Sequence, residues 1–336
     1  MRTNKAINGL PLLCGSLLFA TLALAGSDIE DRLHQSFQVK PGGKLVLEAD
    51  RGSIEVKSAD ADRVEIEVFR KVTREGEAKG QEILKNHEVK FSRDGNKVQV
   101  QAEFTRDWKS VWRDKGRNLQ VRYQISVPKQ FDVDLKTAGG SINVADLTGE
   151  ARGRTAGGSL GFGQIEGRIY GRTSGGGIHV AGCKGGVDVE TSGGSITLGE
   201  VEGDTTAHTS GGSIKVRKVT GKSVVSTSGG SIEAAEVKGS IDASTSGGSI
   251  TASLSEQPTG DCRLHTSGGS IKASLSGNLA VDVSARTSGG RVVTDLPVST
   301  VVQGEHKPNL LSGKINGGGP SLSLETSGGS IYLQKR

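Results

Sequence analysis

The feature that most constrains the fold is a four-residue motif, Thr-(Ser/Ala)-Gly-Gly, which returns ten times along the chain. The first six steps between copies are 18 residues each, the next two are 21, and the last is 39. A period held this strictly is typical of a solenoid, in which each repeat is one unit stacked on its neighbours. The motif begins at Thr137, Thr155, Thr173, Thr191, Thr209, Thr227, Thr245, Thr266, Thr287 and Thr326.

Each repeat also carries two segments of alternating apolar residues, the pattern of β-strands with one buried face. In the repeat that begins at Thr191, Ile196 and Leu198 alternate with polar residues, and Val201, Gly203 and a second alternating segment follow. We therefore expect a unit of strand, glycine corner, strand and Gly-Gly corner. Stacking such units at the ~4.8 Å strand spacing pairs their backbones and joins their apolar stripes into one core.

The composition agrees with a thin core. Of 336 residues, 51 are Gly and only 12 are aromatic (Phe 7, Tyr 3, Trp 2). Small inward residues such as Ala207, Ala234 and Ala243 leave little room for large rings. The sequence predicts an all-β, single-domain parallel β-helix (β-solenoid) of about ten 18-residue coils. Because parallel crossovers are usually right-handed, we expect a right-handed solenoid.

Two other repeat folds fit less well. The hexapeptide left-handed β-helix also has 18 residues per coil, but its apolar residues recur every six positions, which they do not do here. Calcium-binding nonapeptide repeats carry Gly-Gly-x-Gly-x-Asp. The Ser-Gly-Gly-Ser-Ile segments lack that Asp and have another period, so no calcium site is expected.

The regions beside the regular repeats have their own character. Residues 26–136 alternate like strands without the motif, and we expect a β-rich cap that covers the open edge of the solenoid. The charged segment 76–87 predicts one short helix in this cap. Arg51-Gly52-Ser53-Ile54 reads as a degenerate first copy of the repeat. The solenoid then spans 137–336, with an irregular coil over 287–326.

Residues 1–25 have the pattern of a secretory signal peptide. Arg2 and Lys5 precede an apolar run from Leu10 to Leu24, and Ala23-Leu24-Ala25 offers small residues for cleavage. The run is shorter than the ~20 apolar residues of a membrane span. We expect an exported protein, periplasmic or extracellular at the cell surface, with no transmembrane span after cleavage. An uncleaved N-terminal anchor is the alternative.

Several conspicuous residues have a structural interpretation. Cys183 and Cys262 fall in apolar columns about four coils apart, too far for a disulfide, so we expect two free buried thiols. The six scattered histidines are expected on the solvated surface. The Thr and Ser columns can bind a regular surface such as ice or glycan, but local turn hydrogen bonds explain them better.

These motifs resemble a known family. The Thr-Ser-Gly-Gly-Ser-Ile coils, Arg51-Gly52-Ser53-Ile54-Glu55-Val56 and the strand that ends in Ser126-Val127-Pro128 together resemble the DUF4097 family. Its members are β-strand-repeat proteins, also called toastrack domains or adhesins. The resemblance covers about residues 37–336 and implies a bacterial, exported, β-helical protein. It implies no catalytic residue, and some relatives are associated with envelope-stress systems.

Two groups of residues are candidates for ligand binding. The first is a cluster of arginines around one tyrosine on the second strand of the first two coils, where like charges in neighbouring coils repel one another. A cluster that tolerates this repulsion suits an anionic partner, although Asp188 and Glu190 can neutralise it. Its members are Arg152, Arg154, Arg168, Tyr170 and Arg172.

The second group is the pair Trp108 and Trp112, in a basic segment over 106–117 that reads as a hairpin loop. An exposed Trp beside basic groups suits sugar stacking, a membrane interface or a protein contact. The alternative is that both indoles cover the open end of the solenoid.

We expect a non-enzymatic, adhesin-like binding or scaffold protein of the bacterial envelope. Its expected partner is an anionic envelope polymer, a glycan or an envelope protein. The sequence has no catalytic or metal-binding motif and implies no cofactor. Loss of Arg2 and Lys5 with the signal lowers the formal net charge from +5 to +3, which is too mild for a nucleic-acid binder. The alternatives are an accessory domain in envelope-stress signalling and a polysaccharide-acting β-helix enzyme.

Overall fold

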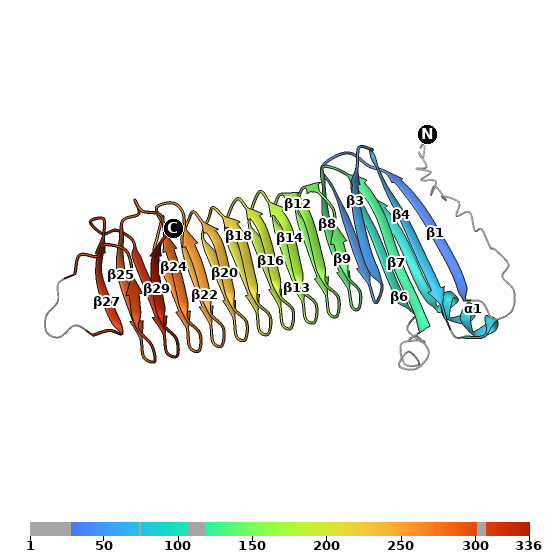
Figure 1. The fold of residues 1–336 in the computed structure, drawn as a ribbon. Coiled ribbons are helices and arrows are strands. Elements are labelled where there is room, and N and C mark those ends of the chain that lie inside the picture. Colours follow the sequence, from blue (N-terminus) through green and yellow to red (C-terminus); the bar gives the residue numbers. More distant parts are fainter. Residues whose placement is uncertain (1–27, 74, 106–117, 301–306) are drawn as a thin grey trace, which may run out of the picture.

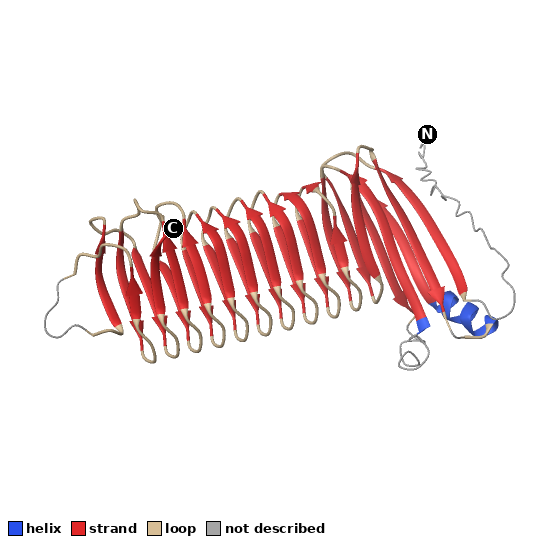
Figure 2. Ribbon diagram, in the orientation of Figure 1, coloured by secondary structure: helices blue, strands red, loops and turns tan. Residues whose placement is uncertain are grey.

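The chain folds into a long rod of two facing β-sheets (Figure 1, Figure 2). The computed structural model describes residues 28–73, 75–105, 118–300 and 307–336. Within these residues, sheet A has 15 strands, sheet B has 14, and one helix, α1 (Glu77–Asn86), lies at the N-terminal end. The inward side chains of both sheets form one buried core along the rod. The predicted all-β parallel solenoid is confirmed.

Neighbouring strands in each sheet are hydrogen-bonded in an order that follows the rod axis. Sheet A contains, in spatial order, β1 (Ile29–Gln38), β4 (Arg63–Val72), β7 (Leu119–Pro128), β3 (Ser53–Ala59), β9 (Ile142–Val144), β12 (Leu160–Glu166), β14 (Ile178–Cys183), β16 (Ile196–Val201), β18 (Ile214–Val219), β20 (Ile232–Val237), β22 (Ile250–Leu254), β24 (Ile271–Leu275), β29 (Ile331–Lys335) and β26 (Val292–Thr294), with β10 (Leu147–Thr148) beside β12. Sheet B contains β5 (His87–Asp94), β6 (Lys97–Phe104), β2 (Gly43–Ala49), β8 (Phe131–Thr137), β11 (Ala151–Thr155), β13 (Ile169–Thr173), β15 (Val187–Thr191), β17 (Thr205–Thr209), β19 (Ser223–Thr227), β21 (Ile241–Thr245), β23 (Cys262–Thr266), β28 (Ser321–Thr326), β25 (Val281–Thr287) and β27 (Leu310–Ile315).

The regular coils stack in register, so that like residues form columns along the rod. Leu160 pairs with Ile178, Ile178 with Ile196, and Ile196 with Ile214, each across parallel strands. All four side chains are buried. Each coil therefore continues the same apolar stripe as the coil before it, which is how repeats too thin to fold alone share a core.

The threonine of each motif holds its corner together. Thr191 Oγ1 donates a hydrogen bond to the carbonyl oxygen of Gly176 in the preceding coil, at 2.7 Å, and accepts one from the Gly194 N–H, at 3.4 Å. All ten motif threonines make such a bond to a neighbouring coil, and all ten are buried. The turn interpretation of the threonine columns is confirmed.

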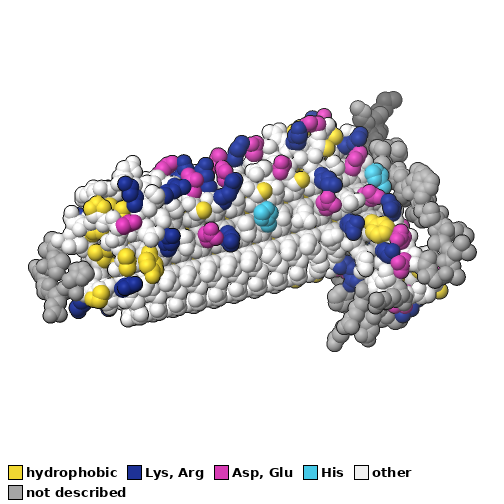
Figure 3. All heavy atoms as spheres, in the orientation of Figure 1, with side chains coloured by type: hydrophobic (Ala, Val, Ile, Leu, Met, Phe, Trp, Pro, Cys, Tyr) yellow, Lys and Arg dark blue, Asp and Glu magenta, His cyan; other side chains and the backbone are white. Residues whose placement is uncertain are grey.

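The two glycines of the motif that begins at Thr155 play different parts. A Cβ at Gly157 would meet no atom within 4 Å, whereas a Cβ at Gly158 would collide with the carbonyl oxygen of Gly140 in the preceding coil. The second glycine is therefore required by close backbone approach rather than by backbone torsion. The corners have few charges: in Figure 3 an uncharged band runs along the lower edge of the rod, while charged side chains of both signs gather along the upper edge.

The cap extends the two sheets of the solenoid and is not a separate plug. β2 pairs with β8 in sheet B and β3 pairs with β9 in sheet A, both parallel. Ile54 lies opposite Ile142, so the segment Arg51–Ile54 is a first copy of the repeat. Beyond this coil, β4 and β1 in sheet A and β5 in sheet B add antiparallel strands. α1 packs on β1, β4 and β5, inside the segment from which the sequence predicts a helix.

A buried arginine ties the cap together. Arg70 on β4 is 8% exposed; its Nη1 donates to the carbonyl oxygens of Leu84 (3.0 Å) and His87 (2.6 Å), at the C-terminal end of α1. The same guanidinium forms an ion pair with Asp31 on β1. Positive charge at a helix C-terminus satisfies carbonyls that have no partner within the helix.

One histidine differs from the sequence expectation. His87 is buried, so the prediction of six solvated histidines is wrong at this position. Its ring lies edge-on to Phe104, and its Nε2 is 3.3 Å from Asp50 Oδ1. His87 follows α1 directly and is the first residue of β5, where the strand alternation turns its side chain inward.

The C-terminal coil does not stack last. β28 lies between β23 and β25, and β29 lies between β24 and β26, so the last segment of the chain occupies an inner position (Figure 1). β27 then covers β25 as an antiparallel strand. The stacking order of the last coils therefore differs from their order in the chain. It buries Leu322 and Leu324 completely, whereas Val292, which faces inward opposite Ile331 on the outer strand β26, is only half-buried.

Cys183 and Cys262 are free and buried, as the sequence predicts. Cys183 lies in the inward column of Ile165 and Val201. Burial raises the pKa of its thiol to about 11, so Cys183 behaves as a small apolar residue at neutral pH.

Candidate ligand-binding site

The arginine and tyrosine residues singled out from the sequence meet on the outer face of sheet B, beside the cap. β11 and β13 are neighbouring parallel strands, and their register places Arg152 opposite Tyr170 and Arg154 opposite Arg172. Arg168 directly precedes β13. The alternation that buries Ala151, Ile169 and the threonines turns these five side chains outward. We call Arg152, Arg154, Arg168, Tyr170 and Arg172 the arginine cluster.

Carboxylates from neighbouring strands compensate most of the positive charge of the arginine cluster. Arg154 Nη1 lies 3.5 Å from Asp134 Oδ1. Arg172 makes two contacts, at 2.8 Å to Asp188 and at 3.2 Å to Glu190. These acidic side chains relieve the repulsion between the stacked guanidinium groups. The cluster is therefore a mixed polar surface that keeps its cations in fixed positions.

Tyr170 is held between two arginines. The Arg152 guanidinium lies over the Tyr170 ring, 4.5 Å from the ring centre, and forms an ion pair with Glu150. Arg168 Nη1 donates to the Tyr170 hydroxyl oxygen at 3.2 Å. The hydrogen bond from Arg152 to Glu150 raises the pKa of the guanidinium above its ordinary value. A stack of this kind is a pre-ordered planar platform with cationic edges.

Lys136 belongs to the same surface, although the sequence argument did not include it. Lys136 pairs in register with Arg154, which pairs with Arg172, so three cations form a column across β8, β11 and β13. A groove of about 500 Å³ runs beside this column and is lined by all three side chains and by corner residues such as Ala156 and Ser174. The signal was present in the sequence, because each of the three cations directly precedes a motif threonine.

Lys136 differs from its neighbours in having no ion pair in the described part of the chain. Arg154 and Arg172 are held by carboxylates, while the exposed Lys136 ammonium stays available at one end of the column. The groove therefore offers one unpaired cation followed by two partly compensated ones.

The second sequence candidate lies elsewhere. Trp108 and Trp112 fall in 106–117, outside the described residues, and their contribution stays a prediction. Among the residues that the structure describes, no group of three or more His, Cys, Asp or Glu side chains is placed to hold a metal ion. In the same residues, no helix has both the length and the apolar character needed to cross a membrane.

The sequence matches the family model of Toastrack DUF4097 over residues 43–334, which is most of its length. The chain belongs to this family. The match covers the first coil, most of the cap and the whole solenoid of this Toastrack chain. No protein with a curated description matches the sequence.

Solved structures with similar folds include three bacterial proteins. A "putative cell adhesion protein" from Clostridium sporogenes is 12% identical, with a TM-score of 0.20, over 91% of the Toastrack chain and 100% of its own. A "putative adhesin" from Bacteroides fragilis is 11% identical (TM-score 0.27; 91% and 97% covered). A "putative lipid binding protein" from Parabacteroides distasonis is 11% identical (TM-score 0.36; 91% and 96% covered). These values are too low to carry a functional argument.

Proposed function

We propose that this Toastrack chain is an exported, non-enzymatic binding protein of the bacterial envelope that holds an anionic polymer along the outer face of sheet B. The observation that carries the proposal is the column of Lys136, Arg154 and Arg172, stacked in register on three neighbouring strands beside a groove of about 500 Å³. The arginine cluster extends this surface through Arg152, Arg168 and Tyr170.

The spacing of the column favours a polymer over a small anion. Neighbouring strands lie ~4.8 Å apart, so the three cations repeat at one short, constant interval. A chain with a negative group on each unit can meet several of them at once, whereas a single small anion meets one. Because Arg154 and Arg172 already form ion pairs with carboxylates, we expect moderate, salt-sensitive binding of the polymer.

Export is proposed from the sequence, since the basic start and the apolar run over residues 10–24 have the pattern of a secretory signal. A rigid rod whose coils repeat the same contacts suits a scaffold outside the cell. The envelope polymers that such a protein meets include acidic polysaccharides.

Binding of the purified chain to alginate, with uncharged dextran as the comparison polymer, tests the proposal. We expect alginate binding at low salt that weakens in 0.5 M NaCl (about the range where surface charges are screened), and no binding to dextran on this face. The double variant Arg154→Glu/Arg172→Glu is expected to weaken alginate binding about tenfold or more.

The control is Arg263→Glu, a single reversal at an exposed position of the same sheet on β23, several coils away. This control is expected to leave alginate binding within twofold. Equal losses in the double variant and in the control, or no alginate binding at low salt, would contradict the proposal.

A further inference from the structure

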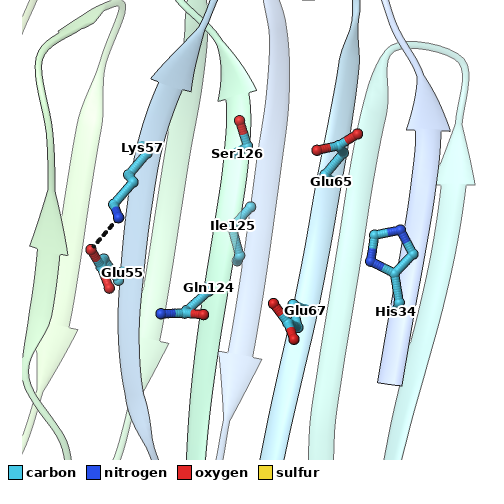
Figure 4. Close-up of a pocket in the computed structure, with 8 residues that line it drawn as sticks. All are labelled: His34, Glu55, Lys57, Glu65, Glu67, Gln124, Ile125 and Ser126. Atoms are coloured by element: carbon cyan, nitrogen blue, oxygen red, sulfur yellow. Dashed lines mark ion pairs between the residues drawn. The ribbon is translucent and has the colours of Figure 1, made fainter. Parts of the chain in front are cut away.

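A second groove crosses the outer face of sheet A, on the other side of the rod, where the cap meets the solenoid. It consists of two hollows of about 240 Å³ and 310 Å³ that share Glu55 and Lys57. The first hollow lies over β1, β4, β7 and β3, and Figure 4 shows its lining side chains on these strands. The second continues over β3, β9, β12 and β14.

The strand register aligns hydrogen-bonding side chains along this groove. Each member of the row lies opposite the next on a neighbouring strand. Seven strands take part, so the row extends about 29 Å at ~4.8 Å per step. The row consists of His34, Glu67, Gln124, Glu55, Asn143 and His179, with Gly161, which has no side chain, between the last two.

The solenoid half of the groove is open because its outward residues are short. Ala145, Gly163 and Ala181 occupy one outward column and leave the hollow open, while the inward side chains of Phe162, Val56 and Val144 belong to the buried core beneath it. In the same column two coils beyond Ala181 stands Arg217, a long exposed side chain. The hollow is therefore local to the cap junction.

The charges in the groove are compensated by close ion pairs. Lys57 Nζ lies 3.0 Å from Glu55 Oε1, an interaction that also lowers the Glu55 pKa. Arg32 lies 3.4 Å from Glu67 across neighbouring strands. Glu65 is paired with Arg63 at 2.6 Å. The groove thus offers donors and acceptors without net charge.

We propose that this groove binds an extended, uncharged glycan chain. Hydroxyl groups both donate and accept, as do the amides of Gln124 and Asn143 and the hydroxyl of Ser126, while the paired carboxylates add acceptors. The short apolar side chains of Ala145 and Ala181 leave a flat surface for the C–H faces of sugar rings, in the combination of apolar lining and a few polar groups that ligand sites use. A charged polymer finds no net complementary charge here. This glycan site lies on the sheet opposite the arginine cluster and does not depend on it.

Titration of the purified chain with three neutral hexasaccharides, cellohexaose, chitohexaose and maltohexaose, tests the site. Amide chemical shifts of 34–36, 55–57, 65–67, 124–126, 143–145 and 161–163 report it. We expect at least one hexasaccharide to shift these signals saturably, with an affinity that 0.5 M NaCl leaves unchanged within about twofold, because no net charge is involved. The corresponding trisaccharide, which spans less of the row, is expected to bind at least about tenfold more weakly.

Two variants fill the groove with a side chain that the rod already tolerates in the same column. Ala145→Arg and Ala181→Arg each reproduce Arg217 within the groove, and each is expected to reduce hexasaccharide affinity about tenfold or more. Ala235→Arg makes the same change in this column outside the groove and is expected to bind like the original chain.

Three results would overturn the glycan site. They are no binding of any of the three hexasaccharides, hexasaccharide binding that survives both Ala145→Arg and Ala181→Arg, and equal losses of affinity in these two variants and in Ala235→Arg. The Arg154→Glu/Arg172→Glu variant keeps hexasaccharide binding if the two sites are separate. Loss of alginate binding alone therefore reports on sheet B, and loss of hexasaccharide binding alone reports on sheet A.

Discussion

The regular coils and the cap form one pair of sheets but are held together differently. In the coils, one small set of contacts repeats: an apolar column, a threonine that bonds the coil before it and a glycine that lets the backbones approach. In the cap, large buried side chains such as Tyr123, Phe104 and Phe131 replace the thin core. Arg70 makes contacts there that occur once.

This difference indicates which substitutions should destabilise each region most. A repeated contact is supported by its copies above and below, so the stability of the coils is close to a sum over neighbours. A unique buried network has no such copies. A change in the cap network is expected to open the cap locally, whereas a change at a motif glycine disturbs the stacking itself.

Arg70→Met gives the largest expected effect. It leaves Asp31 without its buried partner and removes the donor to the carbonyls of Leu84 and His87. We expect a loss of about 3–5 kcal/mol, confined to the cap. Hydrogen exchange measures it: amides of α1 and β1 should exchange much faster, and those of β16 to β22 should not. Arg32→Met, at an exposed ion pair on β1, is the control and should cost less than about 1 kcal/mol. Uniform acceleration along the whole rod would show that the cap is not a separate unit of stability.

Gly158→Ala comes next, with Gly157→Ala as its neighbour in the same motif. The methyl group at 158 collides with the Gly140 carbonyl and forces two coils apart, which we expect to cost about 2–3 kcal/mol. The methyl group at 157 meets open space and should change the free energy of unfolding by less than about 0.5 kcal/mol. Urea denaturation of both variants checks this. Similar losses at both positions would mean that close coil approach is not the reason for the second glycine.

Apolar substitutions at Thr205 and Ser223 are expected to increase the stability of the rod. These two residues face each other in the core on neighbouring strands, and within the described residues neither buried hydroxyl has a hydrogen-bond partner. Thr205→Val and Ser223→Ala remove an unsatisfied polar group, and each should stabilise the rod by about 1 kcal/mol. Thermal unfolding measures the change. A lower melting temperature in both variants would indicate that these hydroxyls are satisfied in solution.

Cys183 predicts no effect at neutral pH but a dependence of stability on alkaline pH. Burial raises the pKa of its thiol from the ordinary value of 9.0 to about 11. The unfolded chain therefore loses this proton first, and the contribution of Cys183, complete below pH 9, is lost as the pH rises through 11. Cys183→Val lacks this contribution. The difference in melting temperature between the two chains should shift in favour of the variant between pH 9 and pH 11, and a constant difference would contradict the burial of the thiol.

The repeated part of the fold could be predicted from the sequence because the same residue type recurs at each position of successive repeats. The columns of Ile178, Ile196 and Ile214 and the free thiols follow from periodicity alone, and the pairing of Arg154 with Arg172 follows from the 18-residue step. The position of the last coil could not be predicted, because the 39-residue step fixes no stacking order. His87 was misplaced because a contact made once in the cap leaves no pattern in the sequence. The sheet A groove was missed because β1, β4 and β7 lack the repeat motif, and the sequence gives no register for the antiparallel pairings of β1 with β4 and of β4 with β7.

The most direct test of the stacked rod is a distance between two spin labels in one outward column of sheet A. Labels at His179 on β14 and Lys272 on β24 are separated by five coil steps in the register of the sheet. At ~4.8 Å per step, pulsed electron paramagnetic resonance should give one narrow distribution centred near 24 Å, apart from the reach of the labels. A broad distribution, or a centre well beyond 35 Å (about seven steps), would show that the coils do not lie one upon another.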